Sequence, residues 1–165
     1  MMDDSQPMNS APQGALIRDP DSGAYSRELF APRLAEEAAR ATRELSALTL
    51  CLLEVRAEGG LSGDQVREVL ALVRQTLRVS DVIFRFSDAE FLLMLPATIK
   101  SDGQMTCERL LQNLRGQLPA EVSLHVGLAT HPEDLLDHEK LLDLLYARKD
   151  AAVQAGPDTC VSTGS

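Results

Sequence analysis

Tryptophan is absent from the 165-residue sequence, and the other aromatic residues make up only 4% of it. So few aromatic rings argue against a protein that holds single-stranded nucleic acid by base stacking. Basic residues are also scarce, because 16 Lys and Arg stand against 25 Asp and Glu, for a net charge of −9. We therefore expect no positive surface field for nucleic acid or for an anionic membrane.

Cysteine is rare, and the three cysteines at positions 51, 107 and 160 are widely separated with no C-x-x-C spacing. This pattern is more typical of buried thiols in a reducing cytoplasm than of a disulfide framework or a zinc site. No hydrophobic run approaches the roughly 18 residues of a membrane span. The acidic start of the chain also differs from the basic beginning of a signal peptide. The sequence predicts a cytoplasmic protein with neither nucleic-acid nor membrane partners.

The length and the 44% hydrophobic content suit one domain with its own core. We expect a disordered N-terminal tail at residues 1–14, a domain at residues 15–161 and a C-terminal tail at residues 162–165. Within the domain, apolar spacing alternates between helical and strand periods. The predicted helices and strands are a helix over 27–45 that starts late or kinks at Pro32, a strand over 47–55 buried on both faces, a helix after a capping box at Ser62 and Gln65, a hairpin of 81–86 and 90–95, a helix after Ser101 with Cys107, Leu111, Leu114 and Leu118 inside, a strand over 122–128, a helix after Asp137 and a short strand over 159–161. This order predicts an α/β sandwich with a mixed sheet.

The hairpin carries the most informative residues. Between its strands the chain reads Arg-Phe-Ser-Asp-Ala-Glu-Phe from Arg85 to Phe91, which resembles the R-[YF]-G-G-[DE]-E-F signature of the GGDEF domain of diguanylate cyclases. Four further blocks match segments of that family and occur in the family's order: 19–27, 52–55, 123–129 and 145–149. The resemblance extends over nearly the whole chain between the two tails.

The resemblance implies a sandwich of the GGDEF, nucleotide-cyclase-like type, with a central mixed sheet of about five strands flanked by helices and the signature on a hairpin. In active members, two such domains face each other, each binds one GTP, and together they make cyclic di-GMP. The signature glycines let the backbone approach the nucleotide, because no side chain intervenes. Two carboxylates hold the Mg²⁺ ions that neutralise the triphosphate.

This chain departs from that pattern at the signature itself. Ser87 and Asp88 stand where the family has glycines, and Ala89 stands where it has a metal-binding acid, whereas Glu90 and Phe91 match. A carboxylate at position 88 would repel phosphate oxygens, and an alanine offers a metal no ligand atom. The resemblance therefore implies a degenerate diguanylate cyclase with no catalytic residues, no bound metal and no cofactor.

A second departure lies after Glu54, which matches another acidic position of the family. The stretch from Glu54 to Gly63 is shorter than in family members. The missing residues would include a lysine that binds phosphate and an asparagine that reads guanine. Asp64 and Lys149 match a guanine contact and a phosphate contact, but each lacks its neighbouring partner. These losses also predict that the chain is not an enzyme.

A different nucleotide site of the family is retained in the sequence. Some members bind their product through an R-x-x-D motif that ends five residues before the signature, and Arg78 to Asp81 occupies that position. A further family arginine falls on Arg109. Guanidinium groups bind phosphates and the O6 and N7 acceptors of guanine in a forked geometry, and an aspartate can accept hydrogen bonds from guanine N–H groups. The alternative is that Arg78 and Asp81 form an ion pair at a helix end.

Two functional hypotheses remain. In the first, the chain is a cyclic di-GMP receptor that binds the ligand through Arg78, Asp81 and Arg109 and signals to an unidentified protein partner. In the second, it is a ligand-independent interaction module or scaffold, in which the former cyclase surface serves for docking or for homodimerisation. A ligand-independent scaffold would not need Arg78, Asp81 and Arg109, whereas a receptor would, so these three residues discriminate between the hypotheses.

Overall fold

The computed structural model describes residues 23–164. The predicted N-terminal tail and the first part of the family-like opening segment lie outside the described residues. The elements follow the order β1 (Tyr25–Ser26), η1 (Arg27–Leu29), α2 (Phe30–Arg43), β2 (Leu48–Arg56), α3 (Gly63–Thr76), β3 (Val82–Arg85), β4 (Glu90–Pro96), α4 (Lys100–Gln117), β5 (Ser123–His131), η2 (His138–Lys140), α5 (Leu141–Ala155) and β6 (Thr159–Val161).

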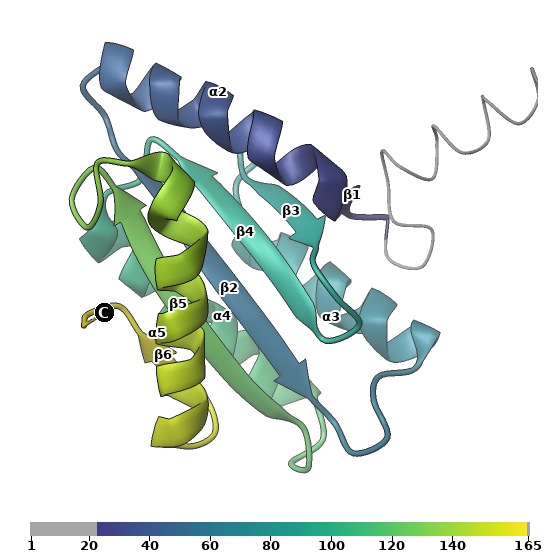
Figure 1. Ribbon diagram of the computed structural model, residues 1–165. Helices are drawn as coiled ribbons and strands as arrows, with labels where there is room; N and C mark the ends of the chain where they lie inside the picture. The colour runs from purple at the N-terminus through teal and green to yellow at the C-terminus, as the bar shows by residue number, and fades with distance from the viewer. Residues whose placement is uncertain (1–22, 165) are drawn as a thin grey trace, which may run out of the picture.

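These strands form one mixed sheet in the order β1-β3-β4-β2-β5-β6 (Figure 1). The four inner strands pair antiparallel, whereas β1 runs parallel to β3 and β6 parallel to β5. The predicted α/β class and mixed sheet are confirmed. The sheet has six strands instead of about five, because a two-residue edge strand, in which Tyr25 pairs with Phe84, precedes α2.

Strand β2 lies at the centre of the sheet, between β4 and β5. Every residue from Leu48 to Val55 is buried, which agrees with the unbroken apolar run that predicted a strand covered on both faces. Burying one leucine side chain of such a run contributes about 1.5–3 kcal/mol. The strand therefore fixes the register of its neighbours, and with it the position of Glu54 near its end.

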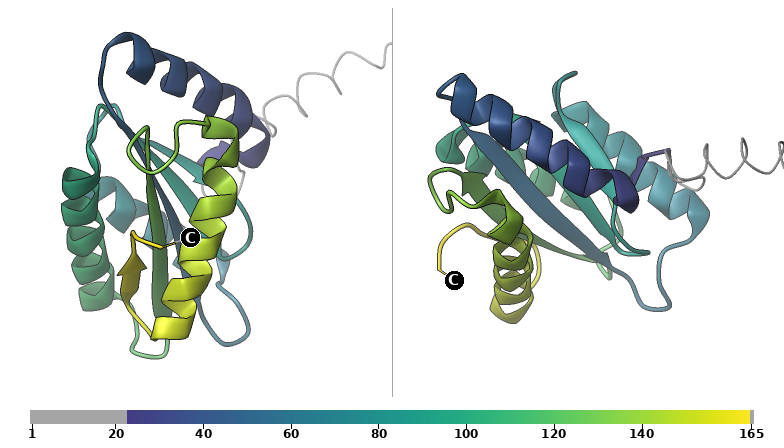
Figure 2. Two further views of the ribbon diagram at one scale, coloured as in Figure 1. Left: turned by 60° about the vertical axis from the view of Figure 1, so that its left-hand side comes forward. Right: turned by 45° about the horizontal axis from the view of Figure 1, so that its top comes forward.

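Two helical layers cover the sheet (Figure 2). Helices α3 and α4 pack on one face over residues such as Cys51 and Leu53, and helices α2 and α5 pack on the other over Leu50 and Leu52. Among residues 23–164, none of the helices is both long enough and apolar enough to cross a bilayer.

The helix starts follow local sequence signals. Helix α2 begins at Phe30 after a short 3₁₀ turn, so the late start expected from Pro32 is confirmed. Proline is tolerated there because the first-turn N–H groups have no partner within the helix. Helix α3 begins with the predicted capping box of Ser62 and Gln65. On α4, Leu111 packs against the core as predicted but is only partly buried, whereas Leu110, which the sequence did not single out, is fully buried.

Helix α5 lies unusually close to strand β5 at Gly127. A Cβ atom at this position would lie 2.5 Å from both the Leu145 carbonyl oxygen and the Lys149 backbone nitrogen. Only glycine allows this approach, because any side chain would meet the helix backbone. The contact holds the Lys149 backbone directly over the sheet.

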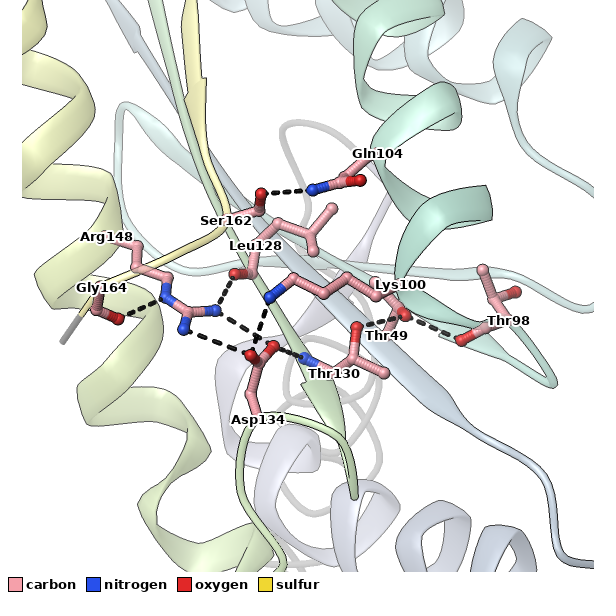
Figure 3. Close-up of polar contacts among 10 residues, drawn as sticks. All are labelled: Thr49, Thr98, Lys100, Gln104, Leu128, Thr130, Asp134, Arg148, Ser162 and Gly164. Carbon is pink, nitrogen blue, oxygen red and sulfur yellow. Dashed lines mark hydrogen bonds and ion pairs between the residues drawn. The ribbon is translucent and has the colours of Figure 1, made fainter.

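A buried ion cluster joins the start of α4 to the middle of α5 (Figure 3). The carboxylate of Asp134 lies 2.9 Å from Lys100 Nζ and 3.1 Å from Arg148 Nη1, and it accepts a hydrogen bond from the backbone of Thr130. Burial by itself would raise the pKa of Asp134, but hydrogen bonds from Arg148, Lys100 and Thr130 outweigh it and lower that pKa. The cluster thus fixes the start of α4 relative to α5.

The C-terminal tail also contacts the domain. Arg148 donates a hydrogen bond to the carbonyl oxygen of Gly164, and Gln104 donates one to the hydroxyl of Ser162 (Figure 3). Residues 162–164 therefore lie against α4 and α5.

Candidate functional site

The β3–β4 hairpin carries polar residues at both of its ends. At one end is the turn that contains the signature-like residues 87–89, here called the hairpin end. At the other end, α3 leads into β3 through Arg78 and Asp81, and β4 leads into α4 through Thr98; we call this the arginine end. The two ends differ in how their charged groups are paired.

The turn at the hairpin end is closed by the protein's own groups. Arg85 donates hydrogen bonds from Nε to the Ser87 carbonyl oxygen at 2.8 Å and from Nη2 to that of Asp88 at 3.1 Å. The Ala89 carbonyl oxygen accepts from the Val55 backbone at 2.8 Å. The Asp88 side chain is fully exposed, so its negative charge lies in solvent in front of the turn.

Next to this turn, two carboxylates face each other across the sheet. Glu54 on β2 and Glu90 on β4 are direct cross-strand partners. The Nζ atom of Lys149 on α5 lies 2.9 Å from Glu54 Oε1 and 3.3 Å from Glu90 Oε2. Arg56 Nε lies 2.5 Å from Glu54 Oε2, and the Tyr146 hydroxyl donates a long hydrogen bond of 3.4 Å to Glu90. The two acids are therefore neutralised by cations of the chain itself.

These contacts shift the protonation equilibria of the site. Burial alone would raise the pKa of Glu54, but hydrogen bonds from Arg56 and Lys149 outweigh it and lower that pKa. Burial would likewise lower the pKa of Lys149, but hydrogen bonds to Glu54 and Asp150 raise it above the ordinary value. Both shifts favour the ion pair, so it is charged at neutral pH.

The hairpin end does not fit the pair of magnesium ions that the resemblance attributes to active members of the family. Ala89 presents a methyl group at the signature's acidic position, and both remaining acids are ion-paired with Lys149. Within the part of the chain that the structure describes, no group of three or more His, Cys, Asp or Glu could hold a metal ion. No catalytic step can be derived through a metal at these residues.

At the arginine end, the R-x-x-D residues form a tight turn. The Arg78 backbone N–H donates to Asp81 Oδ2 at 2.8 Å, and the Asp81 N–H donates to the Arg78 carbonyl oxygen at 3.0 Å. The Arg78 guanidinium binds the Pro96 carbonyl oxygen at 3.0 Å and Thr98 Oγ1 at 2.5 Å through Nη2. The helix-end ion pair exists, but at 3.7 Å from Arg78 Nη2 to Asp81 Oδ1 it is longer than a hydrogen bond.

Asp81 is the unusual residue of this turn. Its side chain is only 3% exposed, and its Oδ1 atom is buried without any hydrogen-bond partner among the described residues. A buried polar atom without a partner costs free energy, typically about 1–3 kcal/mol and more for a charged group. The cost is removed if a donor from outside the chain reaches that oxygen.

The three predicted site residues line one cavity. Arg78, Asp81 and Arg109 border a hollow of about 230 Å³, together with residues of α4 such as Asp102 and Met105. The Arg109 guanidinium makes one long hydrogen bond, 3.4 Å from the Thr76 carbonyl oxygen, and Arg78 is 59% exposed. Both guanidinium groups thus keep donors available next to the unpartnered Asp81 oxygen.

Sequence reasoning missed several groups around this cavity. Thr98 and the Pro96 carbonyl oxygen orient the Arg78 side chain from another strand end. Arg33 on α2 and Arg74 on α3 line a second cavity that Arg78 also borders. These residues match no motif, and they meet Arg78 only through tertiary packing, so the sequence carried no local signal for them.

The three cysteines, widely spaced in sequence, gather in the core. Cys51 Sγ and Cys107 Sγ lie 3.0 Å apart and both residues are fully buried, whereas Cys160 on β6 is partly exposed. Contact with Cys107, followed by burial, raises the pKa of Cys160. Protonated thiols of this kind are weak nucleophiles and pack as small hydrophobes.

Known proteins share this sequence pattern. The family model described as "Diguanylate cyclase, GGDEF domain" matches residues 16–156. Diguanylate cyclase DgcP of Pseudomonas aeruginosa is 36% identical over 102 residues, which cover 57% of this chain and 15% of DgcP. The chain thus spans only a small part of that curated relative.

Solved structures share the fold. Diguanylate cyclase SiaD of Pseudomonas aeruginosa, in complex with its activator SiaC, is 27% identical with a TM-score of 0.79, covering 95% of this chain and 65% of that one. The GGDEF domain of DgcB from Caulobacter crescentus, in complex with cyclic di-GMP, is 17% identical with a TM-score of 0.79, covering 90% of this chain and 94% of that one. At that identity the likeness concerns the fold alone. The match over residues 16–156, together with the sheet and its signature-bearing hairpin, shows that the chain belongs to the GGDEF domain family of diguanylate cyclases.

Proposed function

We propose that this GGDEF domain makes no cyclic di-GMP but binds it at the arginine end, through Arg78, Asp81 and Arg109, and passes the signal to a protein partner. The observation that carries the proposal is the unpartnered, buried Oδ1 of Asp81, which borders the same cavity as two arginines with free donors. This arrangement offers an acceptor to a base and guanidinium groups to a phosphate.

The ligand's chemistry complements that arrangement. Each guanine of cyclic di-GMP carries N–H donors on one edge and the O6 and N7 acceptors on another. The N–H donors would satisfy Asp81, while a guanidinium would bind O6 and N7 or a phosphate in a forked geometry. The crystal structure of DgcB contains cyclic di-GMP, which supports a ligand of this class for the fold.

The hairpin end supports the loss of catalysis. Lys149 already neutralises Glu54 and Glu90, Ala89 cannot coordinate a metal, and the Asp88 carboxylate lies in solvent before the turn. The β2–α3 connection has only residues 57–62, so it lacks room for the missing base and phosphate contacts. Phosphoryl transfer needs positioning and charge neutralisation together, and neither remains here.

A receptor without catalytic activity can pass on its signal by binding a protein partner. The structure of SiaD shows a diguanylate cyclase in complex with its activator SiaC. If ligand binding fails for this chain, the ligand-independent interaction module remains as its function.

Calorimetry with cyclic di-GMP tests the receptor directly. We expect a dissociation constant in the micromolar range, about −8 kcal/mol. Arg78→Ala and Arg109→Ala should each weaken binding by about 2 kcal/mol, because hydrogen bonds to a charged group are lost. Arg78→Lys should also weaken binding, since an ammonium cannot reproduce the planar fork.

The control is Arg67→Ala, which removes an exposed arginine of α3, the helix that precedes the turn, from outside the cavity. It should bind like the wild type, and so should Glu90→Gln at the hairpin end. Absence of binding by the wild type at about 100 μM ligand would reject the receptor proposal. Binding lost in Glu90→Gln but kept in Arg78→Ala would instead place the ligand at the hairpin end.

Turnover is tested separately, with GTP and Mg²⁺. We expect no cyclic di-GMP above a no-protein control. The triple variant Ser87→Gly, Asp88→Gly, Ala89→Asp restores the signature and should still be inactive, because the β2–α3 connection stays short. Turnover by the wild-type protein that disappears in Glu90→Gln would contradict the proposal.

A further inference from the structure

A second and larger cavity also borders Arg78 and Asp81. It has a volume of about 500 Å³ and is bordered by Arg33, Arg74 and Arg78, with Asp81 as the only acidic residue among its described lining residues. Three arginines so close together are unusual in a chain of net charge −9. The cavity is therefore a local basic region on an acidic protein.

The rim of this cavity is also apolar. Val79 borders it and is fully exposed, with a relative accessibility of 105%, and Leu77 and Ile83 contribute to its wall. Arg33 is ion-paired with Glu37 at 3.1 Å, whereas Arg74 makes no ion pair with any residue of the range 23–164. An exposed aliphatic side chain beside an arginine without such a pair fits a segment that is both acidic and apolar.

The chain itself contains such a segment. Residues 1–17 include Asp3 and Asp4 and no Lys or Arg, and they hold three of the five methionines of the protein, at positions 1, 2 and 8. Methionine is flexible and adapts to irregular surfaces. The described chain begins at Gly23, and Tyr25 lines the cavity, so the described part of the chain starts beside the basic region.

We propose that residues 1–17 dock in the cavity bordered by Arg33, Arg74 and Val79, with the two aspartates on the arginines and methionines on Val79. Covalent attachment gives the segment an effective concentration in the millimolar range, so a weak contact suffices for substantial occupancy. Because Arg78 borders both cavities, the docked segment competes with a ligand for that arginine. This last consequence rests on the function proposed above; the docking does not.

The absence of tryptophan provides a direct test. Val79→Trp introduces a single tryptophan at the rim of the cavity, and its acrylamide quenching is compared with and without residues 1–17. Removal of the segment should raise the quenching constant by about twofold, as expected when a tethered segment is docked for a large part of the time. Leu136→Trp, at an exposed position after β5, is the control and should not respond to the truncation.

Charge variants on the Val79→Trp background identify the contact. Arg74→Glu should raise quenching as the truncation does, whereas Arg67→Glu, on the same helix but outside the cavity, should leave it unchanged. Equal quenching of the introduced tryptophan in the full-length and truncated proteins overturns the proposal. Protection that survives truncation but falls on dilution also overturns it, and assigns the surface to a second copy of the chain.

Measurement of cyclic di-GMP binding with and without residues 1–17 separates this proposal from the receptor proposal. If both hold, removal of residues 1–17 should tighten cyclic di-GMP binding about two- to tenfold, because a larger fraction of the protein becomes competent to bind. Protection of the introduced tryptophan without any cyclic di-GMP binding supports the docking and rejects the receptor. The same protection with ligand affinity unchanged by truncation overturns the competition at Arg78.

Discussion

The two ends of the β3–β4 hairpin differ in how closely their buried carboxylates are paired with cations. At the hairpin end, Glu54 and Glu90 share the Lys149 ammonium, and each has a further polar contact. Glu54 Oε1 and Asp81 Oδ1 are both buried without a well-directed hydrogen bond from the described residues. Lys149 Nζ lies 2.9 Å from the first oxygen, whereas at the arginine end Arg78 Nη2 lies 3.7 Å from the second and binds Pro96 and Thr98 instead. A closely paired charge needs no ligand, whereas a loosely paired buried acceptor is stabilised by one, which is the reason we propose the ligand site at the arginine end.

The largest effect should come from removing the cation of the hairpin end. Lys149→Met leaves Glu54 and Glu90 facing each other across two strands without their shared partner. Breaking a buried ion pair in this way should lower the free energy of unfolding by about 3 kcal/mol. Urea unfolding at pH 7 measures the loss.

Two control variants test whether the loss of stability comes from the broken ion pair. Lys140→Met, at an exposed lysine, should change stability by less than about 0.5 kcal/mol. Adding Glu54→Gln and Glu90→Gln to Lys149→Met should recover much of the loss, because the unpaired charges are gone. A triple variant as unstable as Lys149→Met would show that lost packing, and not unpaired charge, causes the loss of stability.

The next effect concerns the helix that brings Lys149 to the acids. Gly127→Ala forces a Cβ atom to within 2.5 Å of the backbone of α5, so the helix must shift away from the sheet. We expect a loss of about 2 kcal/mol in urea unfolding, the range found for overpacked cores.

Gly116→Ala is the matched substitution for Gly127→Ala. Gly116 lies in α4 with nothing within 4 Å of the added Cβ, so it should gain up to about 1 kcal/mol through helix propensity. A tolerated alanine at position 127 would mean that the close approach of α5 does not determine where Lys149 lies.

A smaller effect should follow from pH. The pKa values of Glu54 and Asp134 are lowered in the folded protein. Their contribution to the free energy of unfolding is therefore fully present above the ordinary carboxyl pKa values of 4.5 and 3.8. It is lost as the pH falls through the pKa values of the folded protein. The pKa of Lys149 is raised, so the contribution of this lysine to the free energy of unfolding is present below the ordinary pKa of 10.5 and is lost only above it. Stability measured from pH 3 to pH 8 should therefore decline toward the acid side. Glu54→Gln should show a shallower acid decline, and an unchanged profile would contradict the role of that carboxylate.

The smallest effect is expected at the arginine end. Asp81→Asn keeps the acceptor that holds the Arg78 backbone and removes a charge whose ion pair with Arg78 is 3.7 Å long, so stability should change by less than about 0.5 kcal/mol. The same substitution at Asp134, whose oxygens are all engaged (Figure 3), should cost about 2 kcal/mol. Equal losses in the two variants would remove the distinction between a carboxylate that is satisfied by the fold and one that is not.

The reliable sequence predictions rest on local signals. The buried run of β2, the capping box at Ser62 and the hairpin with its short turn all depend on neighbours within a few positions, and each is confirmed in the structure. The inner face of α4 shows the limit of this reasoning, because Leu110 and Leu111 differ by only about 100° on a helix. Only the packing of α4 on the sheet makes Leu110 fully buried and Leu111 partly buried.

For the candidate site, the sequence by itself determined which groups are present: the R-x-x-D turn, Arg109 and the alanine in place of a metal ligand. Only the tertiary structure decided how they are paired. Lys149 reaches Glu54 and Glu90 because Gly127 admits α5 close to the sheet, and Asp81 is left with an oxygen that no described residue binds because Arg78 turns to Thr98 on another strand end. Hydrogen bonds and ion pairs form between atoms a few ångströms apart, and that proximity arises from contacts between segments far apart in the chain, which no local pattern encodes.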